Sequence, residues 1–95
     1  MWAAEASGAS VRWWRLDPAQ PCGDPPSLAS LAALVGPRTR LVALTHVSNI
    51  LGSIFDVAAA TDVVRARSPK AHVAVDGVAY VPHKAPDVQA IGCDW

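Results

Sequence analysis

The stretch that most constrains the fold is Ala71–His83, AHVAVDGVAYVPH. Its first half is mostly apolar and β-branched, which is typical of a strand buried on both faces of a parallel sheet. Asp76 stands at the end of this strand, and Gly77 lets the chain turn sharply after it. An ionised carboxylate beside so much apolar surface is costly unless a cation or strong hydrogen-bond donors face it. We therefore expect Asp76 to have a partner.

A strand–helix–strand pattern leads up to this stretch. Arg40–His46, RLVALTH, has a near-continuous apolar centre and predicts a buried parallel strand. Val57–Arg67 carries apolar residues on one helical stripe, with Asp56 as a cap at its start and Ser68 and Pro69 at its end. A helix of this length between two strands is typical of the βαβ unit, whose crossover is right-handed. The sequence therefore predicts an α/β fold with a parallel sheet.

The two strand ends of a βαβ unit lie at the same edge of the sheet, where open α/β sheets bind their ligands. The turn after the first strand carries Ser48 and Asn49. We therefore expect an amide to converge with the carboxylate of Asp76, and such a polar pair in an apolar setting suits a binding site. Polar pairs also tie loops together, so the spacing alone leaves a structural role open.

The remaining segments predict shorter elements around this unit. First come a helix that ends at Gly8, a strand formed by SVRWWRL, a proline-rich loop and a second helix that ends at Gly36; a helical turn and the start of another strand follow the βαβ unit. In order, these segments are residues 2–7, 10–16, 17–26, 27–35, 87–91 and 93–95, and the second helix begins either near Ser27 or at Asp24, with Pro25 in its first turn. Arginine beside tryptophan can also bind nucleic acid by stacking, but the neutral chain favours a core or edge strand.

Composition limits the class of protein. At 95 residues the chain is long enough for one small domain, and its 52% of hydrophobic residues implies faces that something outside the chain covers. A formal net charge of zero gives no electrostatic footprint for nucleic acid or for an anionic membrane. The sequence has no basic leader and no apolar run of about 20 residues. We therefore expect a protein of the cytoplasm or of an organelle's interior.

The cysteines and histidines show no metal-binding spacing. Cys22 and Cys93 fall in unrelated contexts, which is typical of a reducing compartment. Cys22 has no neighbour that supports a role as a nucleophile, and Cys93 is expected to be a small buried hydrophobe. His46, His72 and His83 match no zinc pattern. We therefore expect no metal site.

Two stretches of sequence are more specific than this spacing. THVSNILGSI and, after one helix, VAVDGVAYVPHKAPDVQAIGCDW resemble the aminotransferase class V family of pyridoxal-phosphate enzymes, and within it the cysteine desulfurase-like proteins. The resemblance implies that the chain is a parallel-sheet βαβ fragment of the large domain of a fold-type I transferase. It also implies pyridoxal 5'-phosphate as the cofactor, with Asp76 bound to the pyridine nitrogen and Asn49 near the phenolic oxygen.

One residue departs from the pattern of this family. Many cysteine desulfurases have a glutamine three positions after the aspartate, where this chain has Ala79 followed by Tyr80. Tyr80 either substitutes for that hydrogen-bond donor or, as we favour, packs in the core. The departure favours a divergent, desulfurase-like branch of the family.

The resemblance also implies which parts of the enzyme lie outside this sequence. The lysine that forms the Schiff base is expected just after Trp95, and neither Lys70 nor Lys84 matches its position. Residues 1–95 are therefore expected to be a partial large, cofactor-binding domain. The phosphate-binding part, the strand with the Schiff-base lysine and the small domain are absent from it.

The implied activity is a reaction of an amino acid through a Schiff base, of the β-elimination or desulfuration type, in a homodimer. Because no residue of the chain can form the Schiff base, we assign no catalytic residue and expect the chain alone to be inactive. The alternative is a non-catalytic remnant or an interaction module that associates with a full-length relative through exposed apolar faces. An in-frame lysine in the genomic sequence after Trp95 would favour the enzyme. A generic nucleotide-binding domain lacks support, since the chain has no Gly-rich phosphate motif.

Overall fold

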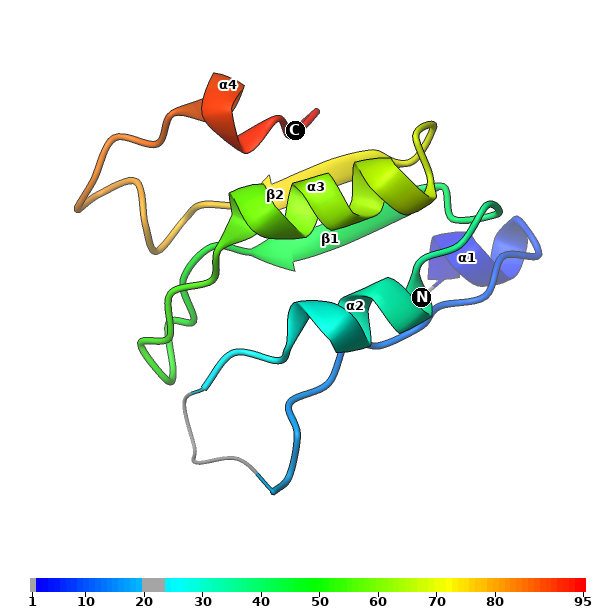
Figure 1. Cartoon of the computed structure of the whole chain (residues 1–95), viewed down its shortest axis with the longest axis horizontal. Helices are drawn as coiled ribbons and strands as arrows, with labels where there is room; N and C mark the ends of the chain where they lie inside the picture. Colours follow the sequence, from blue (N-terminus) through cyan, green and yellow to red (C-terminus); the bar gives the residue numbers. More distant parts are fainter. Residues whose placement is uncertain (1, 20–23) are drawn as a thin grey trace.

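The computed structural model of the chain describes residues 2–19 and 24–95. Over these residues the chain forms four helices and two strands, whose bounds are, in chain order, α1 Trp2–Ala6, α2 Leu28–Leu34, β1 Leu41–Thr45, α3 Val57–Arg67, β2 His72–Asp76 and α4 Val88–Ile91. In Figure 1, α2 lies beside α3, the two strands run next to α3, and α4 lies close to the C-terminus. The predicted strand–helix–strand order is confirmed.

β1 and β2 form a parallel sheet, and α3 is the connection between them. The register pairs Leu41 with His72 at the amino ends of the strands and Thr45 with Asp76 at their carboxyl ends. Parallel strands need such a crossover because a short turn can join only antiparallel neighbours. The α/β fold class with a βαβ unit is therefore confirmed.

The last residues of the chain pair with the free edge of β2. The N–H of Asp94 donates to the backbone oxygen of Val73 at 2.8 Å, and the N–H of Val75 donates to the backbone oxygen of Trp95 at 2.9 Å. Evenly slanted bonds of this kind join parallel strands. Residues 93–95, predicted to begin another strand, thus make backbone bonds to β2, but they are not part of a strand and the sheet of the described residues has two strands.

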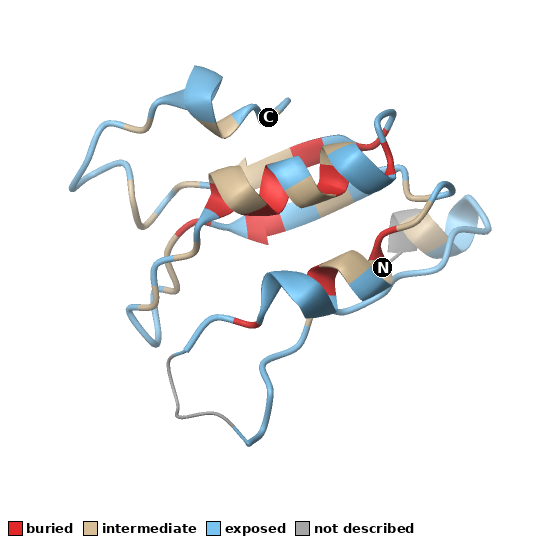
Figure 2. Ribbon diagram, in the orientation of Figure 1, coloured by how far each residue is buried: buried red, intermediate tan, exposed pale blue. Residues whose placement is uncertain are grey.

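A single hydrophobic core lies between α2, α3 and the sheet. The stripe of α3 predicted to face inward does so, since Val57, Ala60 and Val64 are buried and Val63 packs against them. Figure 2 shows the buried residues concentrated on α3 and on the parts of α2 and the strands that adjoin it. Among the residues whose burial is described, the buried members of this core are Leu31, Val35, Leu44, Val57, Ala60, Val64, Ala71 and Val73.

The prediction that both strands are buried on both faces is wrong for this chain. In β1, Leu44 is buried and Val42 half-buried, whereas Leu41 on the opposite face is 61% exposed. The cause is that α3 covers one face of the sheet and α2 packs on α3, while none of the described helices contacts the other face. An apolar run indicates that a strand can be buried, but it does not indicate which element, if any, covers each of its faces.

The prediction of a strand at residues 10–16 is also wrong. This segment, all of which the structure describes, is irregular and runs along α2. The Trp14 indole N–H donates to Ser30 Oγ at 2.8 Å, and its ring meets that of Phe55 edge-on at 6.3 Å. The Arg12 guanidinium donates to the backbone oxygen of Leu34 at 3.1 Å. Side-chain hydrogen bonds to α2 therefore hold the segment in place, and its backbone does not join the sheet.

Local sequence signals set the starts of α2 and α3 as predicted, whereas α2 ends one residue earlier than predicted, at Leu34, and the cap of α4 was not predicted. Ser27 and Asp56 cap the starts of α2 and α3 by accepting backbone N–H bonds, and Asp87 does the same for α4. Gly92 ends α4 in the left-handed conformation, at φ 69°, which glycine adopts without strain. None of the helices in the described ranges is long and apolar enough to cross a membrane.

Candidate functional site

The carboxyl ends of β1 and β2 meet as the sequence predicts. Thr45 pairs with Asp76 in the register, and the next N–H along the chain, that of His46, donates to the backbone oxygen of Asp76 at 2.9 Å. The turn that follows β1 therefore starts directly beside the end of β2. Ligands of open α/β sheets bind at such an edge.

The turn after β1 is closed by its own hydrogen bonds. The N–H of Ser48 donates to the backbone oxygen of Ser53 at 2.9 Å, and the N–H of Gly52 donates to that of Ser48 at 2.8 Å. The Ser48 hydroxyl accepts from the N–H of Leu51 at 3.1 Å. Asn49 lies in this turn and is exposed. The predicted site asparagine is thus held on an ordered turn with its side chain open to solvent.

Asp76 is exposed, so the prediction that its carboxylate is buried is wrong for this chain. It ends a strand whose open face is uncovered, and Gly77 turns the chain away from the sheet. Its Oδ1 accepts from the N–H of Val78 at 3.0 Å, and its other oxygen has no donor among the described residues. No ion pair of the described residues includes Asp76. Its carboxylate therefore has spare capacity for a cationic donor.

The structure brings Asn49 and Asp76 to one edge without joining them. Among the hydrogen bonds of residues 2–19 and 24–95, none connects the two side chains. The alternative that this pair ties the two loops together therefore has no support here. Two polar side chains that are both exposed and not bonded to each other are available to a ligand.

Tyr80 packs against His46 at the end of β1, half-buried and outside the hydrophobic core cluster in which it was predicted to pack. Its ring stacks on that of His46 with centroids 3.6 Å apart and planes 11° apart. The N–H of Tyr80 donates to the backbone oxygen of Gly77 at 2.9 Å and closes the turn that follows Asp76. Local sequence gave no signal for this ring pair, because His46 follows β1 and Tyr80 follows β2.

His46 is the buried ionisable group nearest to this edge. Only 8% of its surface is exposed, and no described residue forms a hydrogen bond with its ring nitrogens. Burial lowers the pKa of the His46 imidazole below its usual 6.5, because the charged form loses its hydration. The neutral ring is therefore favoured at physiological pH.

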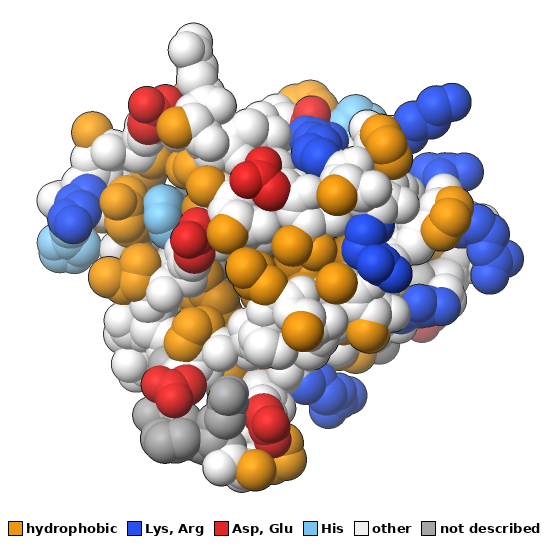
Figure 3. All heavy atoms as spheres, viewed as in Figure 1, with side chains coloured by type: hydrophobic (Ala, Val, Ile, Leu, Met, Phe, Trp, Pro, Cys, Tyr) orange, Lys and Arg blue, Asp and Glu red, His pale blue; other side chains and the backbone are white. Residues whose placement is uncertain are grey.

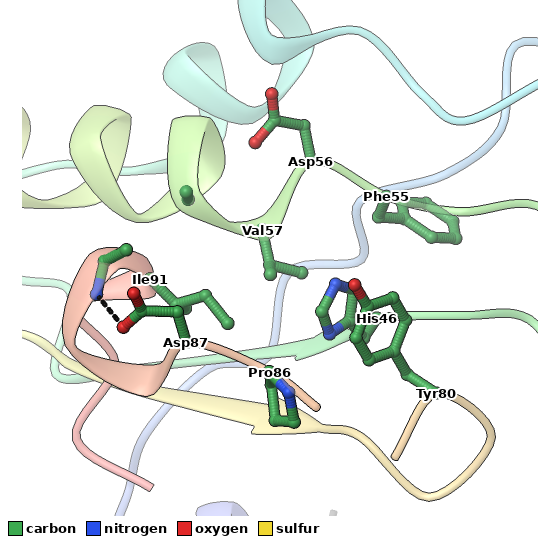
Figure 4. A pocket seen from close by; sticks show the side chains of 10 residues that line it. His46, Phe55, Asp56, Val57, Tyr80, Pro86, Asp87 and Ile91 are labelled. Carbon is green, nitrogen blue, oxygen red and sulfur yellow. Dashed lines mark hydrogen bonds between the residues drawn. The ribbon is translucent and has the colours of Figure 1, made fainter. Parts of the chain in front are cut away.

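A pocket of about 190 Å³ opens next to this ring pair. Figure 4 shows His46 and Tyr80 on one side of it, Phe55 and Val57 above them, and Pro86, Asp87 and Ile91 across from them. Its carboxylates, Asp56 and Asp87, cap α3 and α4. The pocket is thus built from the start of two helices and the segment that follows β2.

The other predicted candidates lie away from this edge or are exposed. Lys70 and Lys84 are both exposed, and Figure 3 shows most Lys and Arg side chains on the side of the amino ends of the strands. His83 is exposed, and the part of the chain that the structure describes holds no group of acidic, histidine and cysteine residues that could bind a metal. Cys93 is free and half-buried against the core, and Cys22 lies outside the described residues.

Sequence reasoning missed the role of Asp94. Its Oδ2 accepts from the backbone N–H of Val73 at 2.7 Å and from the Arg65 guanidinium at 2.8 Å. The backbone bond and then the Arg65 bond lower the pKa of the Asp94 carboxyl. Arg65 also donates to the backbone oxygen of Gly92 at 3.1 Å. These bonds fix residues 92–95 against α3 and β2, which no local pattern indicates.

Comparison with known proteins identifies the family. The sequence model of the family described as aminotransferase class-V matches residues 1–95. An aminotransferase-like protein of Gibberella zeae is 47% identical over 97% of this chain and 22% of its own length. A nonribosomal peptide synthetase-like enzyme of Aspergillus fumigatus is 44% identical over 99% of this chain and 6% of its own length.

A cysteine desulfurase of Dickeya dadantii is 48% identical over 72% of this chain and 16% of its own length. The chain thus spans less than a quarter of the length of each of these relatives, at most 22%. The match over all residues confirms the resemblance carried by the motifs on either side of α3. The chain belongs to the aminotransferase class-V family, in its cysteine desulfurase-like group.

Proposed function

We propose that residues 1–95 are part of the cofactor-binding large domain of a pyridoxal-phosphate enzyme that acts on an amino acid by a desulfurase-like reaction. The family is generally dependent on this cofactor and acts on amino acids. The observation that carries the proposal is the register, which puts Asp76 beside the turn that bears Asn49. That edge is where an α/β sheet binds its ligand.

The donor set of this edge fits the pyridine end of the cofactor. Asp76 has one oxygen occupied by the N–H of Val78 and one without a described donor, and no described cation neutralises it. A protonated pyridine nitrogen supplies both a positive charge and a directed N–H, so it forms a charge-assisted hydrogen bond with a carboxylate. When bound, the cofactor supplies an electron sink for negative charge at the substrate α-carbon. Asp76 would hold the proton on the ring nitrogen.

Asn49 would help to hold the same cofactor from the turn after β1. The turn of Ser48–Ser53 is closed by backbone hydrogen bonds, so the amide is presented from a defined backbone. Its N–H₂ group can donate to a phenolic oxygen, while its carbonyl oxygen can accept from a substrate amine. With Asp76 and Asn49 on neighbouring strand ends, this chain would fix the plane of the ring.

We propose that groups outside these 95 residues complete the enzyme. Lys70 lies before β2 and Lys84 in the segment after it, and both are exposed. Neither matches the position that the family resemblance implies for the Schiff-base lysine. The covalently bound lysine, the phosphate site, the small domain and a second subunit would come from elsewhere. The chain by itself would bind the cofactor weakly and catalyse nothing.

The exposed apolar side chains favour a second candidate function. Leu41 is 61%, Ile54 62% and Val78 81% exposed. An interaction module that associates with a full-length relative would cover such a surface. This candidate requires no contact between Asp76 and a cofactor, so measurements of cofactor binding separate the two.

The first test compares pyridoxal phosphate with its 1-deaza analogue, which lacks the ring nitrogen, by equilibrium dialysis against the 95-residue chain. Because Asp76 is exposed, its pair with the ring is expected to contribute about 0.2–1 kcal/mol, or up to about fivefold tighter binding of pyridoxal phosphate. Asp76→Asn should abolish this preference. Asp62→Asn is the matched control, since Asp62 is exposed on α3. Equal binding of both compounds by the unaltered chain would contradict the proposal.

The second test concerns the expected lack of a reactive lysine. Borohydride reduction of the chain with pyridoxal phosphate, followed by mass spectrometry, should give only low, scattered labelling of Lys70, Lys84 and the N-terminus. Both lysines are exposed, so neither is held in a site that would favour its reaction over that of other amines. A single lysine labelled at stoichiometric yield would overturn the expectation that the chain alone is inactive.

A further inference from the structure

The stacked rings of His46 and Tyr80 join the two strand ends at the candidate site. Their centroids are 3.6 Å apart and their planes nearly parallel, at 11°. Figure 4 shows the Tyr80 ring lying flat against His46 at the mouth of the pocket. His46 is 8% exposed, so the contact is largely shielded from water. Aromatic pairs in such contact prefer defined relative orientations.

The backbone of His46 contacts Asp76, and the backbone of Tyr80 contacts Gly77, the next residue. The N–H of His46 donates to the backbone oxygen of Asp76 at 2.9 Å, and the backbone oxygen of His46 accepts from the N–H of Phe55 at 2.9 Å. His46 is thereby fixed to the end of β2 and to the far side of its own turn. On the other side, the N–H of Tyr80 donates to the backbone oxygen of Gly77 at 2.9 Å. The stack therefore spans both ends of the turn that follows Asp76.

The carboxylate of Asp76 depends on this turn for its orientation. Its one hydrogen bond to described residues comes from the N–H of Val78, at 3.0 Å, inside the turn. The N–H of Val81 also donates to the backbone oxygen of Gly77 at 2.9 Å, but the side chains of Val78 and Val81 bury little, because these residues are 81% and 57% exposed. Tyr80 is the half-buried aromatic residue of this segment, and it is attached to a buried partner. Loss of the stack would free the turn and, with it, the N–H that holds Asp76.

We propose that His46 and Tyr80 are positioning residues whose stacked rings fix the turn of residues 76–80 and thereby aim the Asp76 carboxylate at the cofactor's ring nitrogen. This inference rests on the proposed function. It gives Tyr80 an indirect role through His46 and the backbone, which differs from direct donation to the phenolic oxygen.

The first experiment measures the orientation of Asp76 in the chain without any ligand. Three-bond NMR couplings to the carboxyl carbon of Asp76 report the populations of its χ1 rotamers. One rotamer should dominate in the unaltered chain and in Tyr80→Phe, which keeps the ring, whereas Tyr80→Ala should populate several. Val81→Ala is the matched control, because it alters an exposed residue of the same segment.

A variant that unfolds would change the signals of α3 and β2 as well as that of Asp76. In that case Tyr80→Leu replaces Tyr80→Ala, since leucine keeps apolar bulk and removes the flat ring. Several rotamers in Tyr80→Leu, with α3 and β2 intact, support the inference. A single unchanged Asp76 rotamer in a folded chain that lacks the ring overturns it.

The second experiment measures the preference for pyridoxal phosphate over its 1-deaza analogue in the same variants. The preference expected for an exposed pair is up to about fivefold, and Tyr80→Phe should keep it. Tyr80→Ala and Tyr80→Leu should bind the two compounds about equally. A preference that survives loss of the ring overturns the inference. If the unaltered chain shows no preference while the rotamers still depend on Tyr80, the positioning role stands and the proposed function fails.

Discussion

Asp94 and Asp76 are two surface carboxylates near opposite ends of β2, at Val73 and at the last residue of the strand, and their partners differ. Asp94 accepts from the backbone N–H of Val73 and from the Arg65 guanidinium, which tie residues 92–95 to the sheet. Asp76 accepts from one backbone N–H and has no described cationic partner. A carboxylate with all its partners inside the chain stabilises the fold. A carboxylate with one partner is free to bind something else. We therefore distinguish a structural end of β2, at Val73 and Asp94, from the candidate binding edge at Asp76.

The largest expected effect is on the free energy of unfolding, and it comes from a substitution in the hydrophobic core at Val73, near the end of β2 that Asp94 holds. Val73→Ala should lower the free energy of unfolding by about 2 kcal/mol, because it removes a side chain that is 0% exposed and leaves a cavity. Val78→Ala removes the same atoms at the binding edge, where the side chain is 81% exposed, and should change it by less than about 0.5 kcal/mol. Urea denaturation of both variants measures the difference. Equal losses would show that the two ends are not distinct.

The next effect compares the two carboxylates directly. Asp94→Asn should destabilise the chain clearly, because it weakens the acceptor of two hydrogen bonds, and Asp76→Asn should stay within about 0.5 kcal/mol. The pKa of Asp94 is lowered in the folded chain, so its contribution is present above its unfolded value of 3.8 and is lost as the pH falls through the folded value.

Urea denaturation as a function of pH checks this assignment. The unaltered chain and Asp76→Asn should lose stability in parallel as the pH falls below 3.8, and Asp94→Asn should lose less, because it has no such carboxyl to protonate. A pH dependence in Asp94→Asn that equals that of the unaltered chain would remove Asp94 from its structural role.

A smaller effect concerns the ring pair at the binding edge. The pKa of His46 is lowered by burial, so the unfolded chain takes up a proton before the folded chain does. Above pH 6.5 neither state binds this proton, and stability is complete; below it, stability falls until the pH passes the folded pKa. His46→Phe keeps a flat ring against Tyr80 and should flatten this part of the profile. An unchanged slope near pH 6 would contradict the burial of His46.

The elements that could be predicted from the sequence are those whose signals are local. Apolar spacing and the Asp56 cap are sufficient for α3, and Asp87 with Gly92 is sufficient for the single turn of α4. The meeting of Asp76 with the turn of Asn49 follows from βαβ topology alone. Each of these depends on residues close together in the sequence or on a connection with one common geometry.

The features that could not be predicted depend on partners that local patterns do not specify. The tryptophans of residues 10–16 favour a strand, but a strand also needs an edge, and Trp14 instead donates to Ser30 on α2. Burial of both sheet faces depends on what covers them, so the exposure of Leu41 and Asp76 could not be predicted from an apolar run. The stack of Tyr80 on His46 joins residues far apart in the sequence.

The smallest expected effect tests how tightly the binding edge is packed. Gly77 has no φ in the left-handed region, so its substitution meets only a steric limit. A Cβ there would lie 3.2 Å from Val81 Cγ2, a contact that Val81 can relieve by moving, because it is 57% exposed. Gly77→Ala should therefore change the free energy of unfolding by less than about 0.5 kcal/mol. If it instead costs as much as Val73→Ala, the turn after Asp76 is as rigid as the core, and the contrast between the two ends of β2 fails.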